Sequence, residues 1–316
     1  MPLQSLLPSI GLTKRKLKTL ETIQIVREER DQRKQDLAFN ARPFVMCGLP
    51  LRRPEHSQLA YTRRNGRFSL TIVAHPEFGL PYGQDRLIPI WVATLALRQK
   101  SRVVRFRYLM EFLDYFDLPT TGFYYKRIAC AFQRIFGATI FFGTEEHRDQ
   151  HVFLDWARFH FFDQIRLWYS RDGNPKPAPE GEFQNTITLS DAFFAEIQKH
   201  GIPIERRVVA ALSNAPGTLD FYTWLVWKCW ATKNGTVRIP LFGCNGLAQQ
   251  LGTAEYARDR SFREKINTWL KHVRLWWPAC PARLAPDGRC LTISPQRQAH
   301  AISAVENPVN SCPRTS

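Results

Sequence analysis

The hydrophobic and polar positions of the chain follow two different periods, and the change from one to the other defines the predicted elements. The segment RFSLTIVAH, which begins at Arg67, alternates with a period of two, as a half-buried strand does. Pro and Gly turn residues follow it, and Asp85 then stands as a candidate N-cap before the apolar segment LIPIWVATLALR. The pattern therefore predicts a strand that begins near Arg67, then a turn, and then a helix over residues 85–98.

The same periods predict a series of short elements that ends near residue 212. In order these are a strand over 101–107, helices over 108–116 and 123–136, strands in 138–143 and in the aromatic run 151–169, a strand over 186–189, and helices over 190–200 and 204–212. The polar, proline-rich segment 170–185 interrupts the series, and we expect a wing or a hairpin excursion there. Three helices with an intervening strand and a closing hairpin describe a winged helix-turn-helix.

The C-terminal part of the chain repeats this order of elements. The predictions are a helix over 219–232, a strand over 236–240, helices over 241–252 and 258–275, and a hairpin over 279–293 around a Pro-Asp-Gly turn. Three residues of the first series recur in the second at one constant spacing: the pairs are Trp91 and Trp224, Arg105 and Arg238, and Leu118 and Leu251. We therefore predict an α+β fold with two tandem winged-helix (helix-turn-helix) domains related by internal duplication.

These elements divide the chain into four parts. They are a charged N-terminal arm over 1–42, a first winged-helix domain over 43–200, a second over 201–293, and a tail over 294–316 that lacks periodicity and is expected to be disordered. Within the arm, residues 13–36 carry only a thin apolar strip, so a solvated helix, a docking arm and a frayed leader all remain open, and the pattern favours the frayed leader.

The composition adds a strong positive charge to this picture. Lys and Arg number 44 against 28 Asp and Glu, which gives a formal net charge of +16 and a sequence pI near 9.8. A polyanionic partner is expected, with nucleic acid ahead of an anionic membrane surface, and a generically basic surface is the alternative. With 44% hydrophobic residues the chain can bury a real core, which excludes disorder over most of its length.

Neither a targeting segment nor a metal motif is expected. No apolar run is long enough to span a membrane, and the first residues place cations after the apolar stretch, the reverse of a signal peptide, so we expect the chain to stay in the cytoplasm. The 7 cysteines are scattered without a C-x-x-C pair, which argues against a disulfide framework and a structural zinc site. We interpret them as small, mostly buried residues, none of them a ligand, and expect no cofactor and no metal.

The segment 257–278 combines an apolar face with a cationic one. Wound as a helix, it places six apolar residues on one side: Phe262, Ile266, Trp269, Leu270, Val273 and Trp277. A basic stripe stands opposite, formed by Arg260, Arg263, Asn267, Lys271 and Arg274. The third helix of a winged helix lies in the major groove, so this stripe predicts DNA contact, and a merely solvated helix face is the alternative.

Each stripe residue has an expected role that follows from its chemistry. Arg260 and Arg263 could each present a planar fork to guanine, and Asn267 could pair with adenine. Lys271 and Arg274, further along the helix, are better placed for phosphates. The full set of candidate DNA-binding residues also includes the flanking Arg258, the wing residues Arg283 and Arg289, and, in the first unit, Arg102, Arg105, Lys126 and Arg127.

The corresponding helix of the first unit, 123–136, carries less outward charge. Lys126, Arg127, Gln133 and Arg134 are expected to face outward, so this helix could touch DNA weakly or form a protein interface. Arg102 and Arg105 lie in a strand-like segment nearby, where an exposed strand edge is the alternative explanation.

No catalytic residues are expected. The segment HRDQH (147–151) separates its histidines with charged residues, which does not suit two metal ligands on one strand face, and Tyr124 and Tyr125 are adjacent on a predicted helix. The chain also lacks a G-x-x-x-x-G-K-[ST] phosphate loop. We therefore predict a protein that is not an enzyme, with a rolling-circle nicking initiator as the least favoured alternative.

Several segments resemble the plasmid-encoded RepA family of bacterial replication initiators. They are FGLPYGQDRLIPIWVATLALRQKSRVVRF, ITLSDAFFAEIQKHGIPIERRVVAAL and LDFYTWLVWKC, within a similarity that extends from about Phe44 to about Ile293. The resemblance implies two winged-helix domains, monomers that bind repeated double-stranded origin sequences (iterons), and a homodimer formed through the first domain that represses its own gene. It also implies origin opening, recruitment of the host initiator and the helicase or its loader, and a place in the bacterial cytoplasm in association with the plasmid or nucleoid. Residues 257–278 would then be the iteron-reading helix.

A two-domain winged-helix transcription regulator remains an alternative function. It would read DNA through the same helix, while its aromatic-rich first unit would sense a ligand or a partner. Short direct repeats beside the coding region would favour an initiator, whereas an isolated palindrome would favour a repressor.

Overall fold

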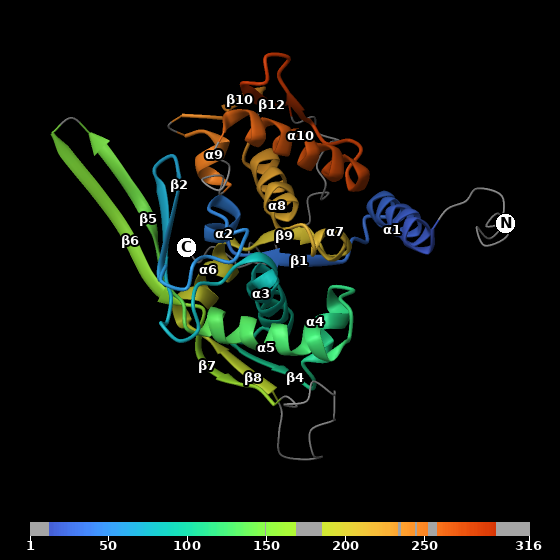
Figure 1. Cartoon of the computed structure of the whole chain (residues 1–316), viewed down its shortest axis with the longest axis vertical. Helices are drawn as coiled ribbons and strands as arrows, with labels where there is room; N and C mark the ends of the chain where they lie inside the picture. The colour runs from blue at the N-terminus through green and yellow to red at the C-terminus, as the bar shows by residue number, and fades with distance from the viewer. Residues whose placement is uncertain are drawn as a thin grey trace, which may run out of the picture.

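The computed structural model describes residues 13–148, 150–168, 185–232, 235–243, 245–251 and 258–294. The chain is an α+β protein, as the sequence predicts, with one group of elements at each end of its long axis (Figure 1). The segment 170–185 and the tail after 294, predicted to be an excursion and a disordered tail, lie almost wholly outside the described residues.

The first unit contains three helices and a three-stranded antiparallel sheet. Its elements are α3 (Leu87–Gln99), β4 (Val103–Phe106), α4 (Met110–Tyr115), α5 (Gly122–Phe136), β7 (Phe162–Arg166) and β8 (Asn185–Leu189). The sheet has the order β4-β8-β7. Trp91 of α3 is buried and holds the unit together, because its ring packs edge-on against Phe106 of β4, Phe112 of α4 and Phe132 of α5.

The second unit has the same order of elements. They are α8 (Pro216–Ala231), β10 (Val237–Pro240), α9 (Leu247–Gln250), α10 (Asp259–Trp276), β11 (Ala282–Leu284) and β12 (Cys290–Ile293), with the sheet order β10-β12-β11. The prediction of a helix over 241–252 is wrong at its start, where the chain bends before α9. Gly243 and Asn245 have φ angles of 85° and 72°, and such left-handed backbone interrupts a right-handed helix.

The residues that recur in the sequence occupy equivalent places in the two units. Trp91 and Trp224 are both buried in the first helix of their unit. Arg105 and Arg238 both lie in the first strand of the three-stranded sheet, with exposed side chains. The remaining pair, Leu118 and Leu251, is buried just after the second helix of each unit.

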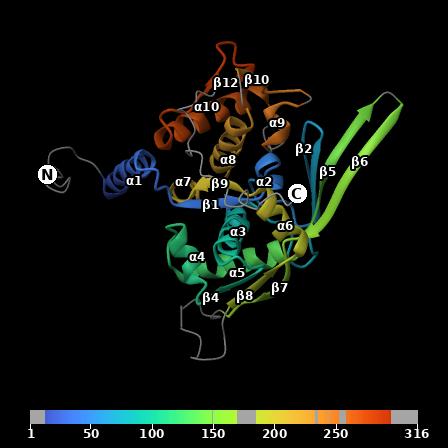
Figure 2. The same ribbon diagram turned by 180° about the vertical axis from the view of Figure 1, so that it is seen from behind.

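A second, four-stranded sheet combines two hairpins, of which one precedes α3 in the chain and the other lies between α5 and β7. It contains β2 (Ala60–Asn65), β3 (Phe68–Val73), β5 (Thr139–Arg148) and β6 (His151–His160) in the order β2-β3-β5-β6. The β5–β6 hairpin projects well beyond the helices in both views (Figures 1 and 2). The aromatic run 151–169 is therefore shared between two sheets, since β6 belongs to this one and β7 to the first unit.

The remaining elements lie between the two units. They are α1 (Lys14–Asp31), β1 (Leu37–Asn40), α2 (Arg42–Met46), the 3-10 helix η2 (Gly83–Arg86), α6 (Asp191–His200), β9 (Ile202–Glu205) and α7 (Arg206–Leu212). Strand β1 pairs with β9 in an antiparallel sheet across the middle of the molecule (Figure 1). The predicted helix over 204–212 therefore starts later, after a short strand.

The N-terminal segment is docked, which differs from the frayed leader that its sequence favours. Arg30 of α1 forms a two-pronged ion pair with Glu205 of β9 and donates to the carbonyl of Trp276 at 2.6 Å. Arg207 of α7 pairs with Glu29 at 2.7 Å. Because the apolar strip of α1 is thin, these ion pairs contribute much of the specificity of its docking. Among the described residues, no helix has the length and apolar character that a membrane span requires.

Candidate nucleic-acid interface

Helix α10 is amphipathic and is fixed by its apolar face. Its buried residues are Phe262, Ile266, Trp269, Leu270, Val273 and Trp276, and Trp277 at its C-cap is also buried. The predicted apolar face is thus confirmed, with Trp276 in addition. Trp269 packs against Phe221 of α8 and edge-on against Phe262, with ring centroids 6.1 and 6.3 Å apart. Burial of this aromatic face sets the rotation of α10 and directs the opposite face outward.

The outward face of α10 carries most of the predicted basic stripe. The exposed residues of the candidate set are Arg258, Arg260, Asn267, Lys271 and Arg274. Sequence reasoning missed one acidic residue on this face, Glu264, which pairs with Arg260 at 3.0 Å. Both partners are exposed, so this ion pair is weak and Arg260 can exchange it for a phosphate or a base edge.

Arg263 has a different environment from its neighbours in the stripe. Its Nε donates to the carbonyl of Gly288 at 2.9 Å, and its guanidinium lies over the Phe242 ring, 5.9 Å from the ring centroid. The Phe242 ring in turn packs edge-on against Phe262, with centroids 5.8 Å apart. The side chain is half-buried. The structure therefore places Arg263 between α10 and the hairpin tip, where it holds the hairpin against the helix.

The β11–β12 hairpin stands beside the outward face of α10. Arg274 donates to the carbonyl of Ala282 at 2.8 Å, which fixes the base of the hairpin to the helix. A hollow of about 570 Å³ separates the two elements, and Asn267, Arg274 and Arg283 all line it. Arg283 and Arg289 are exposed on the hairpin. Helix and hairpin thus form one continuous surface with several cations and an amide.

One thiol lies at the base of this surface. Cys280 also lines the hollow, and burial raises the pKa of its thiol, although the Arg274 charge and a backbone hydrogen bond oppose the rise. It is therefore a neutral, buried group rather than a nucleophile. Burial likewise raises the pKa of Cys47 and of Cys229 to about 12, which agrees with their interpretation as core residues. Cys130, by contrast, is exposed and Cys290 is half-buried.

In the first unit only some of the candidate DNA-binding residues are exposed. Arg105 and Lys126 are exposed. Arg102 instead pairs with Asp163 at 3.0 Å and with Asp191 at 3.1 Å. The half-buried Arg127 lies 5.9 Å from the centroid of the Tyr124 ring. The structure therefore separates Arg105, on the sheet, from Lys126, on α5.

Arg134 does not face outward as predicted. It forms a two-pronged ion pair with Asp85 at 2.6 and 3.0 Å and stacks on Tyr82. Asp85 also accepts from the backbone N–H of Tyr82, so it anchors α5 to the start of α3 in addition to capping η2.

The residues weighed for catalysis form no site in the part of the chain that the structure describes. Tyr125 is buried and Tyr124 is half-buried on α5. Among those residues no group of three or more His, Cys, Asp and Glu could hold a metal ion. The side chain of His147 lies outside them.

Sequence reasoning also missed Arg166 and Arg238, which are exposed on the two three-stranded sheets. The recurrence of Arg105 as Arg238 was the pattern that could have identified the second of them. Arg166 carries no such pattern, because the strand that holds it has no counterpart of matching sequence in the second unit.

Comparisons with known proteins give weak structural similarities and a match to a family model. A comparison with curated proteins gives no match. Among solved structures, a crystal structure of SeMet derivatives of domains 2 and 3 of RctB has a TM-score of 0.47 and 11% identity, over 78% of this chain and 94% of that chain. A second crystal structure of RctB domains 2–3 has a TM-score of 0.45 and 11% identity, over 80% and 98%. Similarity at this level does not by itself establish a shared fold.

The family model described as plasmid-encoded RepA protein matches residues 127–238. These residues extend from α5 to β10 and include the β5–β6 hairpin, whereas α10 lies beyond them. The match is shorter than the range of about 44–293 over which the sequence resembles the family. Over residues 127–238 the chain matches the plasmid-encoded RepA family, and this confirms the resemblance that its sequence motifs indicate.

Proposed function

We propose that this protein binds duplex DNA through α10 and the β11–β12 hairpin, and that it acts as a plasmid replication initiator. The observation that carries the proposal is the outward face of α10. Its aromatic face is buried, while Asn267, Lys271 and Arg274 are exposed beside a cationic hairpin. A helix with donors of this kind fits the major groove, where an amide pairs with adenine and cations hold phosphates.

Both units are winged helices in this proposal, and they derive from one duplicated ancestor. The shared order of elements, the shared sheet order and the equivalent places of Trp91 and Trp224 support it. In the second unit α10 is the recognition helix and β11–β12 the wing. The counterpart of α10 in the first unit is α5, whose exposed Lys126 makes at most an auxiliary contact.

The match to the RepA family model supports a role at a replication origin. On this basis the proposed targets are iterons, that is, directly repeated sequences, and the proposed outcome is origin opening with recruitment of the host initiator and the helicase or its loader. None of these steps requires chemistry by the protein, and we propose that it is not an enzyme. Nicking of supercoiled origin DNA that is lost in a Tyr124→Phe variant would contradict that statement.

We further propose that the first unit forms a homodimer through strand β6, and that this dimer represses the protein's own gene. Strand β6 is the edge of its sheet, and an edge strand leaves a row of backbone groups unpaired. Large apolar side chains on this strand are exposed: Val152, Phe153, Leu154 and Trp156 at 54, 59, 61 and 44%. Two copies of β6 can pair in antiparallel fashion about a two-fold axis and cover this surface.

A transcription regulator is the second candidate, since the same helix would serve it. The test that separates the two is footprinting of the DNA that flanks the coding region with the full chain. Protection of several direct repeats at regular spacing supports the initiator. Protection of a single palindrome supports the regulator, and uniform protection at all sequences contradicts specific binding by α10.

A further inference from the structure

The outer face of the first three-stranded sheet carries a row of three polar side chains across neighbouring strands. Arg105 of β4 and Arg166 of β7 both lie opposite Thr186 of the central strand β8. Both guanidinium groups are exposed, and Thr186 is half-buried between them. We name this set the first row.

The second sheet carries the same row. Arg238 of β10 and Arg283 of β11 both lie opposite Thr292 of the central strand β12. Again both arginines are exposed and the threonine is half-buried. In this second row, as in the first, the order across the sheet is Arg, Thr, Arg.

Strand geometry places both rows on the outward side of their sheets. Successive side chains of a strand point to opposite faces, and the neighbours of the row residues are buried. In the first sheet these neighbours are Val104, Phe106 and Ile187; in the second they are Ile239, Leu291 and Ile293. The rows therefore stand on the faces that the helices leave uncovered.

Each row concentrates positive charge without a compensating acid. In the described part of the chain, none of the four arginines forms an ion pair, unlike Arg102, which lies three residues before Arg105 and is held by Asp163. Two strand spacings of about 4.8 Å separate the backbones of the two arginines in a row. Their mutual repulsion makes a bound anion favourable at both places.

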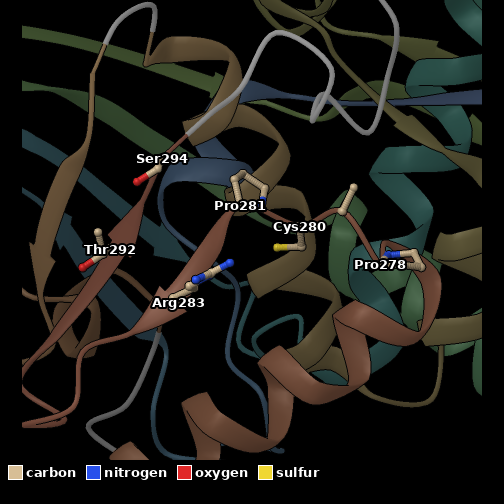
Figure 3. A pocket seen from close by; sticks show the side chains of 7 residues that line it. Pro278, Cys280, Pro281, Arg283, Thr292 and Ser294 are labelled. Atoms are coloured by element: carbon tan, nitrogen blue, oxygen red, sulfur yellow. The ribbon is translucent and has the colours of Figure 1, made fainter.

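The second row also borders a pocket. Arg283, Thr292 and Ser294 line a hollow of about 400 Å³ together with Cys280 and two prolines (Figure 3). The Ser294 hydroxyl is held by the Thr236 hydroxyl at 2.8 Å. A guanidinium with neighbouring hydroxyl groups is a donor set that suits phosphate oxygens. Because Arg283 also lines the hollow beside α10, the second row continues the surface of the recognition helix.

We propose that each row binds backbone phosphates of duplex DNA, so that the protein has one phosphate site on each three-stranded sheet. This inference rests on the proposed function and extends it to residues beyond α10. The rows are open rather than enclosed. Each row is longer than the roughly 3.4 Å, measured along the helix axis, between successive phosphates of one DNA strand. Both features fit a polymer better than a small anion. The sheets lie at opposite ends of the long axis in both views, so the two sites act separately (Figures 1 and 2).

The test measures binding of the full chain to a random-sequence duplex by fluorescence anisotropy over a range of NaCl concentrations. The variants are Arg105→Ala with Arg166→Ala for the first row, and Arg238→Ala with Arg283→Ala for the second. Each pair should make the slope of log K against log salt shallower by about 1 to 2, because each phosphate contact contributes about 0.9.

A matched control removes two charges elsewhere. Arg53 and Arg64 are exposed and lie outside both rows, so Arg53→Ala with Arg64→Ala should leave the slope close to native. Native slopes for either row pair, or an equal loss in the control, would overturn the inference. If in the same experiment Lys271→Ala weakens binding while the row variants do not, only the inference about the rows fails. If the native chain does not bind duplex DNA at all, the proposed function fails with it.

Discussion

Arg86 and Asp220 form a buried ion pair that joins the start of the first unit's α3 to α8 of the second unit. Arg86 also donates to the carbonyls of Gly83, Leu49 and Pro50, at 2.7, 3.1 and 2.9 Å. The guanidinium thus ties Asp220 to the segment 49–50 as well as to its own 3-10 helix. Because Arg86 directly precedes the first helix of the first unit and Asp220 lies in the first helix of the second, this pair fixes the two units relative to each other.

Removal of either partner should destabilise the whole protein. Asp220→Ala leaves a buried guanidinium without its counter-charge, and such a loss costs about 3–5 kcal/mol. The free energy of unfolding, from urea titration followed by tryptophan fluorescence, checks this. Arg260→Ala is the control, since the Arg260–Glu264 pair is exposed and worth only about 0.3–0.5 kcal/mol. A loss for Asp220→Ala as small as that of the control would contradict the role of the junction.

The Arg86→Leu variant should show a characteristic pH dependence. Burial raises the pKa of Asp220, and Arg86 is the main group that opposes this rise. Without Arg86 the folded-state pKa rises further above its unfolded value of about 3.9. A raised folded pKa gives stability that is complete below the unfolded pKa and is lost as pH rises through the folded one. The deficit relative to the native protein should therefore grow from about pH 4 upward, and a deficit that shrinks would contradict the assignment.

Gly217→Ala should move α10. A Cβ at position 217 would clash with the six-membered ring of Trp269, so α8 and α10 could not keep their present contact. Overpacking of this kind costs about 1–3 kcal/mol. We also expect weaker DNA binding, because the exposed face of α10 turns with its buried one. The double variant with Trp269→Phe should recover part of the loss in both measurements, since it removes the clashing ring; additive losses would contradict this explanation.

The homodimer should depend on the exposed apolar residues of β6. Leu154→Glu places a charge on the proposed contact, where it would repel its symmetry copy, and we expect the dimer dissociation constant to rise at least tenfold. Sedimentation velocity over a concentration series measures it. Leu275→Glu, on α10, is the control, since Leu275 is similarly exposed at 52% but lies on the other unit. Dimerisation that is equally strong in the Leu154 variant would place the contact elsewhere.

Local sequence patterns predicted the elements of both units well, whereas long-range contacts could not be predicted. The buried face of α10 follows from its helical period, and Ser190 caps α6 as expected, accepting from Phe193 N–H. The pairing of β1 with β9 and the docking of Arg30 on Glu205 join residues far apart in the sequence. The hydrophobic periodicity of the sequence does not encode such contacts, because they depend on which surfaces meet after the elements form.

The same limit applied to the candidate site. Exposure of Lys271 and Asn267 follows from their helix position, but the contact of Arg263 with the Gly288 carbonyl depends on how the hairpin folds back. The stripe therefore contains two residues that hold the hairpin, Arg263 and Arg274, of which only Arg274 is also exposed. The exposed Arg238 had a visible pattern in its recurrence, but its meaning became clear only from the pairing with Thr292.

The most direct test of the central claim, sequence-specific DNA reading by α10, compares two exposed residues of that helix on two duplexes. One duplex carries the repeat protected in footprinting, and the other carries its scrambled sequence. Asn267→Ala should lose about 1–3 kcal/mol of discrimination, because its amide reads a base edge, and should bind scrambled DNA as the native chain does. Lys271→Ala should weaken binding to both duplexes alike. If Asn267→Ala leaves the ratio of the two affinities unchanged, α10 does not read sequence and the account is contradicted.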